Sequence, residues 1–200
     1  MKVWSHATLV PARPSEAVAG GVDVLSHAGL LLWEVEALPD FRRRLDADYD
    51  KVRPDHARLA QLFRTMAERG TALDATLYVY RQREPAIRFA AEVVRRAHAA
   101  GVPILVGTDA IGAPADGPLP HVHDELELLV TRAGLSPLAA LHAATLAPAR
   151  ALGIEASRGS IVVGKSADLV ILTADPSTDI RNTRAIEAVY RGGKRFGRAP

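Results

Sequence analysis

Three residues that could bind a metal or carry a proton each lie at the end of a short apolar run. His6 lies in "VWSHA", His27 in "VDVLSHA" and Asp109 in "VPILVGTDA". Neutral imidazole and carboxylate are the ligands that hold zinc or a similar divalent ion. A carboxylate beside a metal-activated water can also accept its proton and pass it to a leaving group. The three residues therefore predict a metal site with a proton carrier, provided that the fold brings them together.

Strand-like and helix-like segments alternate along the first three quarters of the chain. The pattern predicts strands at 3–7, 22–28 and 71–80 and a fourth within 102–112. Helices are expected within 14–21, closed by Gly20-Gly21, from an Asp55 cap to Gly70, from Pro85 to Gly101, and at 123–133 and 137–145. Residues 29–54 are irregular and are expected to run over the surface. Strands alternating with helix-length crossovers indicate parallel β/α units.

In a closed β/α barrel the carboxyl ends of the strands form the active-site face. Period-2 alternation assigns each candidate residue to the face of a neighbour in its own strand: His6 with Trp4, His27 with Leu25, and Asp109 with Gly107 and Leu105. If those faces line a barrel, two imidazoles and one carboxylate converge. Each residue also has a structural interpretation, because a strand-end histidine is often only hydrogen-bonded and an aspartate there often caps a turn.

From Gly159 onward, β-branched runs separated by glycine-rich turns predict antiparallel strands. Within them "GSIVVGKS", residues 159–166, matches the phosphate-loop pattern G-x-x-x-x-G-K-[ST]. That loop must lead into a helix, whereas the β-branched "ADLVILTADP" follows Ser166 and favours a hairpin. The sequence therefore predicts no nucleotide-binding residue, and a helix beginning at Lys165 would reverse this conclusion.

Composition limits the class of protein. The 200 residues are 48% hydrophobic and 24% charged with a formal net charge of +2, which argues against wholesale disorder and against a nucleic-acid surface. The absence of cysteine excludes disulfides and thiolate metal sites. With no signal-like start and no apolar stretch of spanning length, we expect a soluble, cytoplasmic protein without a membrane partner.

Five segments follow one another in an order that is specific when taken together: "KVWSHA", "AVAGGVDVLSHA", "GVPILVGTDA", "HDELELLVTRAGLSPLAALHAATLAPARALG" and "GSIVVGKSADLVILTADPSTDI". They run through nearly all of the chain apart from residues 29–70. In this order they resemble the C-terminal half of the amidohydrolase family of metal-dependent barrel hydrolases, nearest its imidazolonepropionase-like and Xaa-Pro dipeptidase-like branch. The resemblance implies an α/β fold, with the equivalent of strands 5–8 of a TIM-type (β/α) barrel in residues 1–155. Residues 156–200 would be an antiparallel tail from a β-sandwich.

The resemblance also implies roles for single residues. His6 matches the metal histidine that ends the fifth barrel strand, and His27 matches the one that ends the sixth. Asp109 matches the aspartate that ends the eighth strand, which ligates metal and transfers the proton. The implied cofactor is a divalent metal, with zinc favoured, and the implied reaction is hydrolysis of C–N bonds in a small amide-type substrate. Tyr78 and Tyr80 are candidates for substrate contact, with aromatic packing as the alternative.

Several family ligands have no counterpart in this chain. The His-x-His of the family's first strand and the carboxylated lysine of its fourth strand are not matched, and His121-x-His123 follows a predicted loop, 112–120, and leads into a helix. We expect His56, His98 and His142 to be structural. Because half a barrel has two unpaired edges, a second copy or a separate N-terminal half is an expected partner. The alternative function is that of a non-catalytic fragment or assembly subunit.

Overall fold

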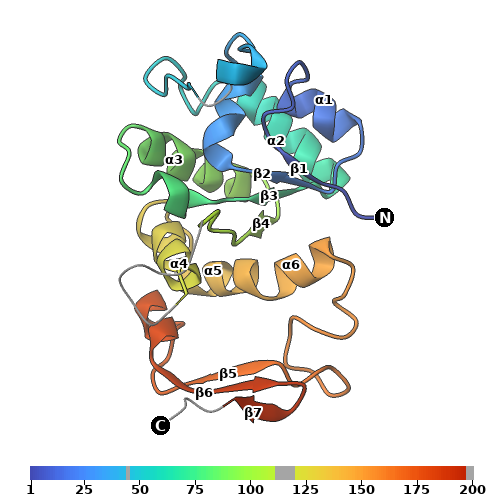
Figure 1. Ribbon diagram of the computed structural model, residues 1–200, viewed down its shortest axis with the longest axis vertical. Coiled ribbons are helices and arrows are strands. Elements are labelled where there is room, and N and C mark those ends of the chain that lie inside the picture. Colours follow the sequence, from blue (N-terminus) through green and yellow to red (C-terminus); the bar gives the residue numbers. More distant parts are fainter. Residues whose placement is uncertain (44–45, 111–119, 197–200) are drawn as a thin grey trace.

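The computed structural model describes residues 1–43, 46–110 and 120–196, and its first part is built on a four-stranded parallel sheet (Figure 1). The strands lie in the order of the sequence: β1 (Trp4–His6), β2 (Val24–Ser26), β3 (Ala72–Asp74) and β4 (Ile104–Leu105). All three neighbouring pairs are parallel, as the β/α alternation predicted. The strands are shorter than expected, and β1 and β4 form the two edges.

Helices connect consecutive strands, which places every strand's carboxyl end at the same edge of the sheet. The connections contain α1 (Pro14–Ala19), α2 (Ala57–Arg69) and α3 (Ala86–Ala99), together with the 3-10 helices η1 (Ala28–Glu34), η2 (Phe41–Arg43) and η3 (Leu77–Tyr80). Gly70 ends α2 with a φ of 70°, as its sequence position predicted. The predicted cap, Asp55, was wrong by one residue, because His56 Nδ1 accepts the Arg58 N–H at 3.2 Å.

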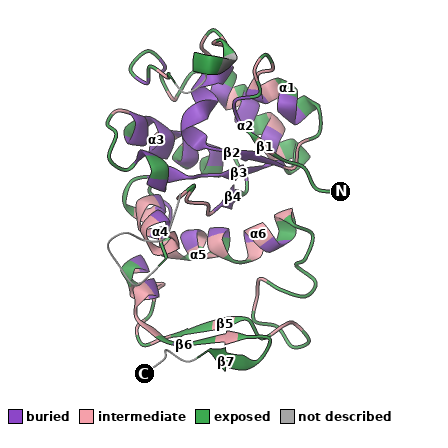
Figure 2. Ribbon diagram, viewed as in Figure 1, coloured by how far each residue is buried: buried purple, intermediate pink, exposed green. Residues whose placement is uncertain are grey.

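The sheet has two buried faces. Leu25, Leu73 and Ile104 pack on α2 and α3 in the main core, while Val24, Ala72 and Leu105 lie on the opposite face with Ala147. Figure 2 shows this burial concentrated in the sheet and in the helices that cover it. The alternation of faces along each strand follows from the pleat of the backbone.

The prediction that residues 29–54 run over the surface was wrong at its start. Residues 28–34 form η1, in which every residue is buried, and Leu31 and Leu32 are fully inaccessible. The run of three leucines followed by Trp33 provides the apolar area that draws this segment into the core. The segment therefore fixes the chain directly after His27 instead of leaving it in solvent.

The predicted strand 71–80 ends early. β3 stops at Asp74, and residues 77–80 form η3, so Tyr78 and Tyr80 lie on a 3-10 turn and not at a strand end. Thr76, which lies between β3 and η3, has a φ of 48°, and an extended strand does not contain such an angle. The amides of Leu77 and Tyr78 donate to the buried carboxylate of Glu125 in place of a neighbouring strand.

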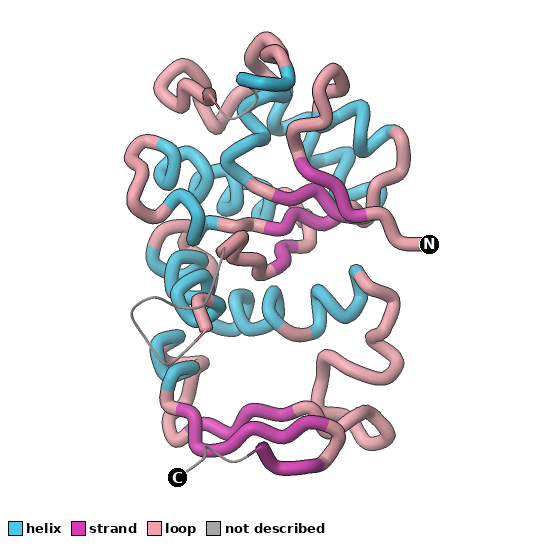
Figure 3. Tube along the Cα trace, viewed as in Figure 1, coloured by secondary structure: helices cyan, strands magenta, loops and turns pink. Residues whose placement is uncertain are grey.

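The second part of the chain places three helices between two sheets (Figure 3). The helices are α4 (Val122–Thr131), α5 (Pro137–Ala144) and α6 (Leu146–Ala151). They are followed by an antiparallel sheet of β5 (Leu169–Leu172), β6 (Ile186–Arg191) and β7 (Lys194–Phe196), with η4 (Ile180–Arg184) before β6. The antiparallel tail confirms the sequence prediction, and the whole is consistent with a partial β/α barrel.

Two further expectations concern this second part. No helix begins at Lys165, whose Nζ donates to Ser160 Oγ at 2.8 Å, and the segment after it leads directly into β5. The phosphate-loop interpretation is therefore contradicted.

Most of the predicted loop 112–120 lies outside the described residues. Among the described helices, none is long and apolar enough to cross a membrane.

We predict that Gly29→Ala destabilises the fold by about 1–3 kcal/mol, as overpacking of a core does. A Cβ at Gly29 would lie 2.6 Å from Cζ of the buried Tyr80 ring. Urea denaturation measures the loss. The matched control is the same change in a Tyr80→Leu background, where the penalty should shrink; an equal penalty in both backgrounds would refute the steric cause.

Candidate active site

The two candidate histidines lie side by side. His6 is the last residue of β1 and pairs with Ser26, the residue before His27. Their ring centroids are 4.1 Å apart with the planes tilted by 54°. His27 is buried and His6 is exposed, so the pair lies at the boundary between the core and the open side of the sheet.

Asp109 joins this pair from the other edge of the sheet. Its Oδ2 lies 3.9 Å from His27 Nδ1, and the Asp109 side chain is half exposed. The structure thus brings together three residues that are up to 103 positions apart along the chain. All three lie at the carboxyl edge of the parallel sheet, where His6 neighbours His27 and His27 neighbours Asp109.

Backbone geometry, and not strand alternation, produces this meeting. Leu25 and Leu105 lie on opposite faces of the sheet, so the predicted grouping of His27 with Leu25 was the wrong reason for convergence. His27 and Asp109 instead adopt left-handed φ angles of 75° and 50° beyond the ends of β2 and β4. With Thr76 at 48°, they are the three non-glycine residues with positive φ in the described chain. Such strain costs about 1–3 kcal/mol per residue and concentrates at functional sites.

Threonine hydroxyls orient both imidazoles. Thr8 Oγ1 lies 2.6 Å from His6 Nδ1, and Thr76 Oγ1 lies 3.0 Å from His27 Nδ1. Burial, together with the neighbouring His6, lowers the pKa of His27 to about 4, although Asp109 opposes this shift. His27 is therefore neutral at pH 7, which is the protonation state in which imidazole binds metals.

A buried carboxyl group beneath the site was missed by the sequence analysis. Trp4 Nε1 donates to Ser26 Oγ at 2.7 Å, and Ser26 Oγ donates to Asp74 Oδ2 at 2.8 Å, so one chain of hydrogen bonds crosses three strands. Asp74 Oδ1 is buried without a hydrogen-bond partner in the described residues and faces Gly107, where a Cβ would lie only 2.1 Å from it. Burial raises the pKa of Asp74 to about 6 with a smaller contribution from the charge of Asp109, although the hydrogen bond from Ser26 opposes the rise. The signal was an aspartate inside the apolar run "TALDATL".

The two candidate tyrosines have different surroundings. Tyr80 is buried edge-on to Tyr49 with centroids 6.2 Å apart; burial raises its pKa, and Tyr49 and the charge of Asp109 add to the rise. Tyr78 stacks on the His121 ring at 4.4 Å and lies under the Arg81 guanidinium at 3.7 Å. The aromatic-packing alternative therefore describes both side chains in this structure.

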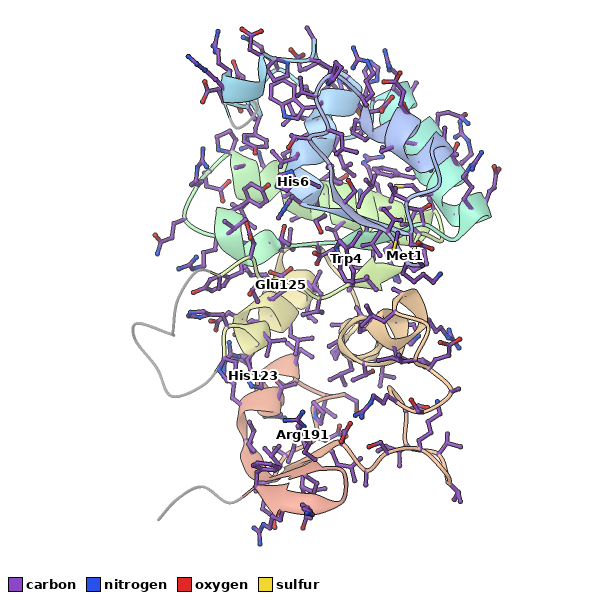
Figure 4. All side chains as sticks on the ribbon, turned by 45° about the vertical axis from the view of Figure 1, so that its right-hand side comes forward. Met1, Trp4, His6, His123, Glu125 and Arg191 are labelled. Carbon is purple, nitrogen blue, oxygen red and sulfur yellow. The ribbon has the colours of Figure 1, made fainter. Side chains whose placement is uncertain are left out.

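The histidines of His121-x-His123 have separate partners. His121 Nδ1 lies 3.3 Å from Asp124 Oδ2, and His123 Nδ1 lies 3.0 Å from Thr183 Oγ1 on η4. Figure 4 shows His123 on α4 beside η4 and Glu125 on the same helix toward the parallel sheet. His123 thus connects α4 to the tail, while His121 contacts α4 and the Tyr78 ring, so the two imidazoles do not form one ligand pair.

Glu125 is the most deeply buried titratable residue at the site. It is fully inaccessible, and its two oxygens accept the amides of Leu77 at 2.9 Å and Tyr78 at 2.6 Å. Burial raises the pKa of Glu125 to about 8, although these two hydrogen bonds oppose the rise. Glu125 therefore holds η3 in place at the carboxyl edge, a role that the sequence did not predict for it.

The donor types at the site suit a divalent metal, although the set is not closed. His6, His27 and Asp109 provide two imidazoles and one carboxylate, which zinc accepts. Because a threonine hydroxyl engages Nδ1 of each imidazole, Nε2 is the atom that each ring would offer to an ion. Within residues 1–43, 46–110 and 120–196, no three histidine, aspartate or glutamate side chains meet at metal-binding distance.

The chain belongs to the amidohydrolase family, because the family model matches residues 17–196. A search of curated proteins finds no match. Three similar solved structures are a Xaa-Pro dipeptidase with bound methionine (22% identity, TM-score 0.71), the A. niger ochratoxinase (24%, 0.69) and a molinate hydrolase (22%, 0.69). Each match covers 98% of this chain but 45%, 41% and 42% of the other. At these identities the likeness shows a shared fold over less than half of each relative.

We predict that Glu125 makes the fold less stable as the pH rises. Its folded pKa of about 8 lies above its ordinary value of 4.5, so its contribution is fully present below 4.5 and is lost as the pH rises toward 8. The free energy of unfolding falls by at most about 1.4 kcal/mol per pH unit from this group. Urea midpoints of the wild type and Glu125→Gln between pH 5 and 8 measure it.

The difference in pH dependence between the wild type and Glu125→Gln reports on Glu125 alone, because His27 and Asp74 titrate in both proteins. Glu68→Gln, on the exposed side of α2, is the matched control and should keep the wild-type pH slope. A Glu125→Gln protein with the same slope as the wild type would show that Glu125 is ionised at low pH in the folded state.

Proposed function

We propose that this chain supplies the metal-binding half of an amidohydrolase that cleaves C–N bonds in small amide-type substrates. His6 and His27 act as metal ligands, and Asp109 acts as ligand and general base. The observation that carries the proposal is the meeting of His6, His27 and Asp109 at one sheet edge, with 4.1 Å and 3.9 Å between neighbouring groups. Membership of the amidohydrolase family supports it independently.

A bound zinc or similar ion would supply Lewis-acid activation of water and of the substrate carbonyl. The protein's own groups do the remaining work. The Thr8 and Thr76 hydroxyls orient the two imidazoles, and the left-handed backbone at His27 and Asp109 turns both side chains toward each other. Asp109 Oδ2 takes the proton from the attacking water and passes it to the departing nitrogen, since the half-exposed carboxylate can reach both.

We further propose that residues 1–155 act as half of a barrel and residues 156–200 as part of a β-sandwich, each completed by another segment or chain. β1 and β4 are sheet edges, and Trp4 on the open face of β1 is 46% exposed. In the tail, the apolar side chains of Val170 and Phe196 are more than half exposed. Unpaired strand edges and exposed apolar side chains favour association, either with a separate N-terminal half or with a second copy.

We predict about one zinc per chain in the purified protein, with the loss of most of it in His6→Ala and in Asp109→Asn. Each substitution removes one of only three donors, and metal affinity depends steeply on the number of ligands. Elemental analysis after dialysis against trace zinc measures the content. His98→Ala is the matched control, because His98 is exposed near the end of α3 and outside the site.

Zinc retained in both variants would place the ion elsewhere and refute the ligand assignment. A folded wild-type protein that takes up no zinc would support the alternative of a non-catalytic assembly subunit. Circular dichroism of each variant separates loss of metal from loss of fold.

A further inference from the structure

Thr76 lies at the start of η3 but does not cap it. Threonine is a favoured residue at this position, where its hydroxyl usually accepts the second or third amide of the helix that follows. The Thr76 side chain makes no such hydrogen bond, and its backbone has φ 48° and ψ 45° instead of the usual extended geometry. Its Oγ1 lies 3.0 Å from Nδ1 of His27. The hydroxyl is thus directed to the candidate metal site and not to its own helix.

Glu125 provides the cap that Thr76 does not. Its Oε1 accepts the Leu77 amide at 2.9 Å, and its Oε2 accepts the Tyr78 amide at 2.6 Å. These are the first two amides of η3, and the Tyr78 amide is one that a capping threonine would accept. Because the first amides of a helix have no acceptor within it, a buried helix end needs one from elsewhere. The fully inaccessible carboxyl group on α4 meets that need.

The backbone of Thr76 is fixed on both sides. On the side of β3, the Ala75 amide donates to the Leu105 carbonyl at 3.1 Å, and the Ala75 carbonyl accepts the Ala28 amide at 3.2 Å. On the other side, Glu125 holds the next two amides. A β-branched residue in the left-handed region is strained, and it persists only where its surroundings over-determine it. The hydroxyl of Thr76 therefore has a defined position beside the imidazole.

Two acceptors face Nδ1 of His27. One is the Thr76 hydroxyl, and the other is the Asp109 carboxylate, whose Oδ2 lies 3.9 Å from the same nitrogen. A neutral imidazole carries one proton, and the hydrogen bonds of the ring decide which nitrogen holds it. Acceptors at Nδ1 favour the Nδ1–H tautomer, which leaves the lone pair of Nε2 for a metal ion.

We propose that Glu125 and Thr76 are positioning residues that together set the tautomer of His27. Glu125 caps η3 in place of Thr76, so the Thr76 hydroxyl remains available to accept a hydrogen bond from Nδ1–H of His27. Without Glu125, the hydroxyl turns toward the uncapped amides of η3 and away from the ring. The use of this tautomer in metal binding rests on the proposed function, but the tautomer itself needs neither metal nor turnover.

The test is ¹⁵N NMR of the metal-free, isotopically labelled 200-residue chain at pH 7, with the His27 signals assigned from the His27→Gln spectrum. The shifts of the two ring nitrogens give the ratio of Nδ1–H to Nε2–H, and we expect Nδ1–H to predominate. Thr76→Val keeps the shape of the side chain without its hydroxyl and should lower the ratio about two- to tenfold, the equivalent of one hydrogen bond. Thr76→Ser keeps the hydroxyl and should stay close to the wild type.

Glu125→Gln tests the other half of the inference, because glutamine has one acceptor oxygen where the carboxyl group has two. It should lower the ratio in the wild type but not in Thr76→Val, where the hydroxyl is already absent. Glu125→Asp, whose carboxyl group lies one methylene further from η3, replaces it if Glu125→Gln does not fold. The matched control is Glu34→Gln, which should leave the ratio unchanged. Glu34 is also buried and accepts a helix amide, that of Ser15 at 2.9 Å, but it lies at the end of η1 distant from His27.

Predominance of Nε2–H in the wild type, or a ratio that Thr76→Val leaves unchanged, would overturn the inference. Equal effects of Glu125→Gln with and without the Thr76 hydroxyl would also overturn it, and so would an equal effect of Glu34→Gln. Zinc affinity is a second readout and should fall about 10- to 100-fold in Thr76→Val, as it does when a metal-binding histidine loses its partner. If the ratio depends on both residues while no zinc is bound, the proposed hydrolase fails and the positioning role stands.

Discussion

The parallel pairing of four short strands is the constraint on which the rest of the site depends. In register, His6 pairs with Ser26, Ser26 with Asp74, and Asp74 with Leu105, so the four carboxyl ends form one row. Parallel strands need helical crossovers, and these crossovers return the chain to the same edge each time. Residues separated by many turns of helix thus meet at a single edge of the sheet.

At the carboxyl edge of the sheet, strained backbone and buried polar groups hold the candidate ligands in position. Left-handed backbone at His27, Thr76 and Asp109 turns the chain where the hydrogen bonds between the strands stop. Such geometry persists only when the surrounding packing supports it. The support comes from the fully buried segment η1 directly after His27 and from Glu125 beneath η3. A buried glutamate is costly unless hydrogen-bonded, and its two amide partners explain why it is tolerated.

The tail is less buried than the barrel part. Its three strands expose much of their apolar surface, while β2, β3 and β4 of the parallel sheet are buried on both faces. α4 links the two parts through His123 with Thr183 and through Arg184 with Asp124 at 2.6 Å. The matched region is less than half of the length of each of these structural relatives.

The amino-acid sequence by itself determined the β/α alternation, the antiparallel tail and the family, and it singled out His6, His27 and Asp109 as candidates, because hydrophobic period and strand-end residues are local signals. Only the tertiary structure decided why these residues meet, since left-handed backbone and not strand alternation brings His27 to Asp109. It also decided the end of β3 at Asp74 and the burial of Glu125. Those outcomes depend on contacts across 47 or more residues, such as Glu125 with Tyr78, and no local pattern encodes a long-range partner.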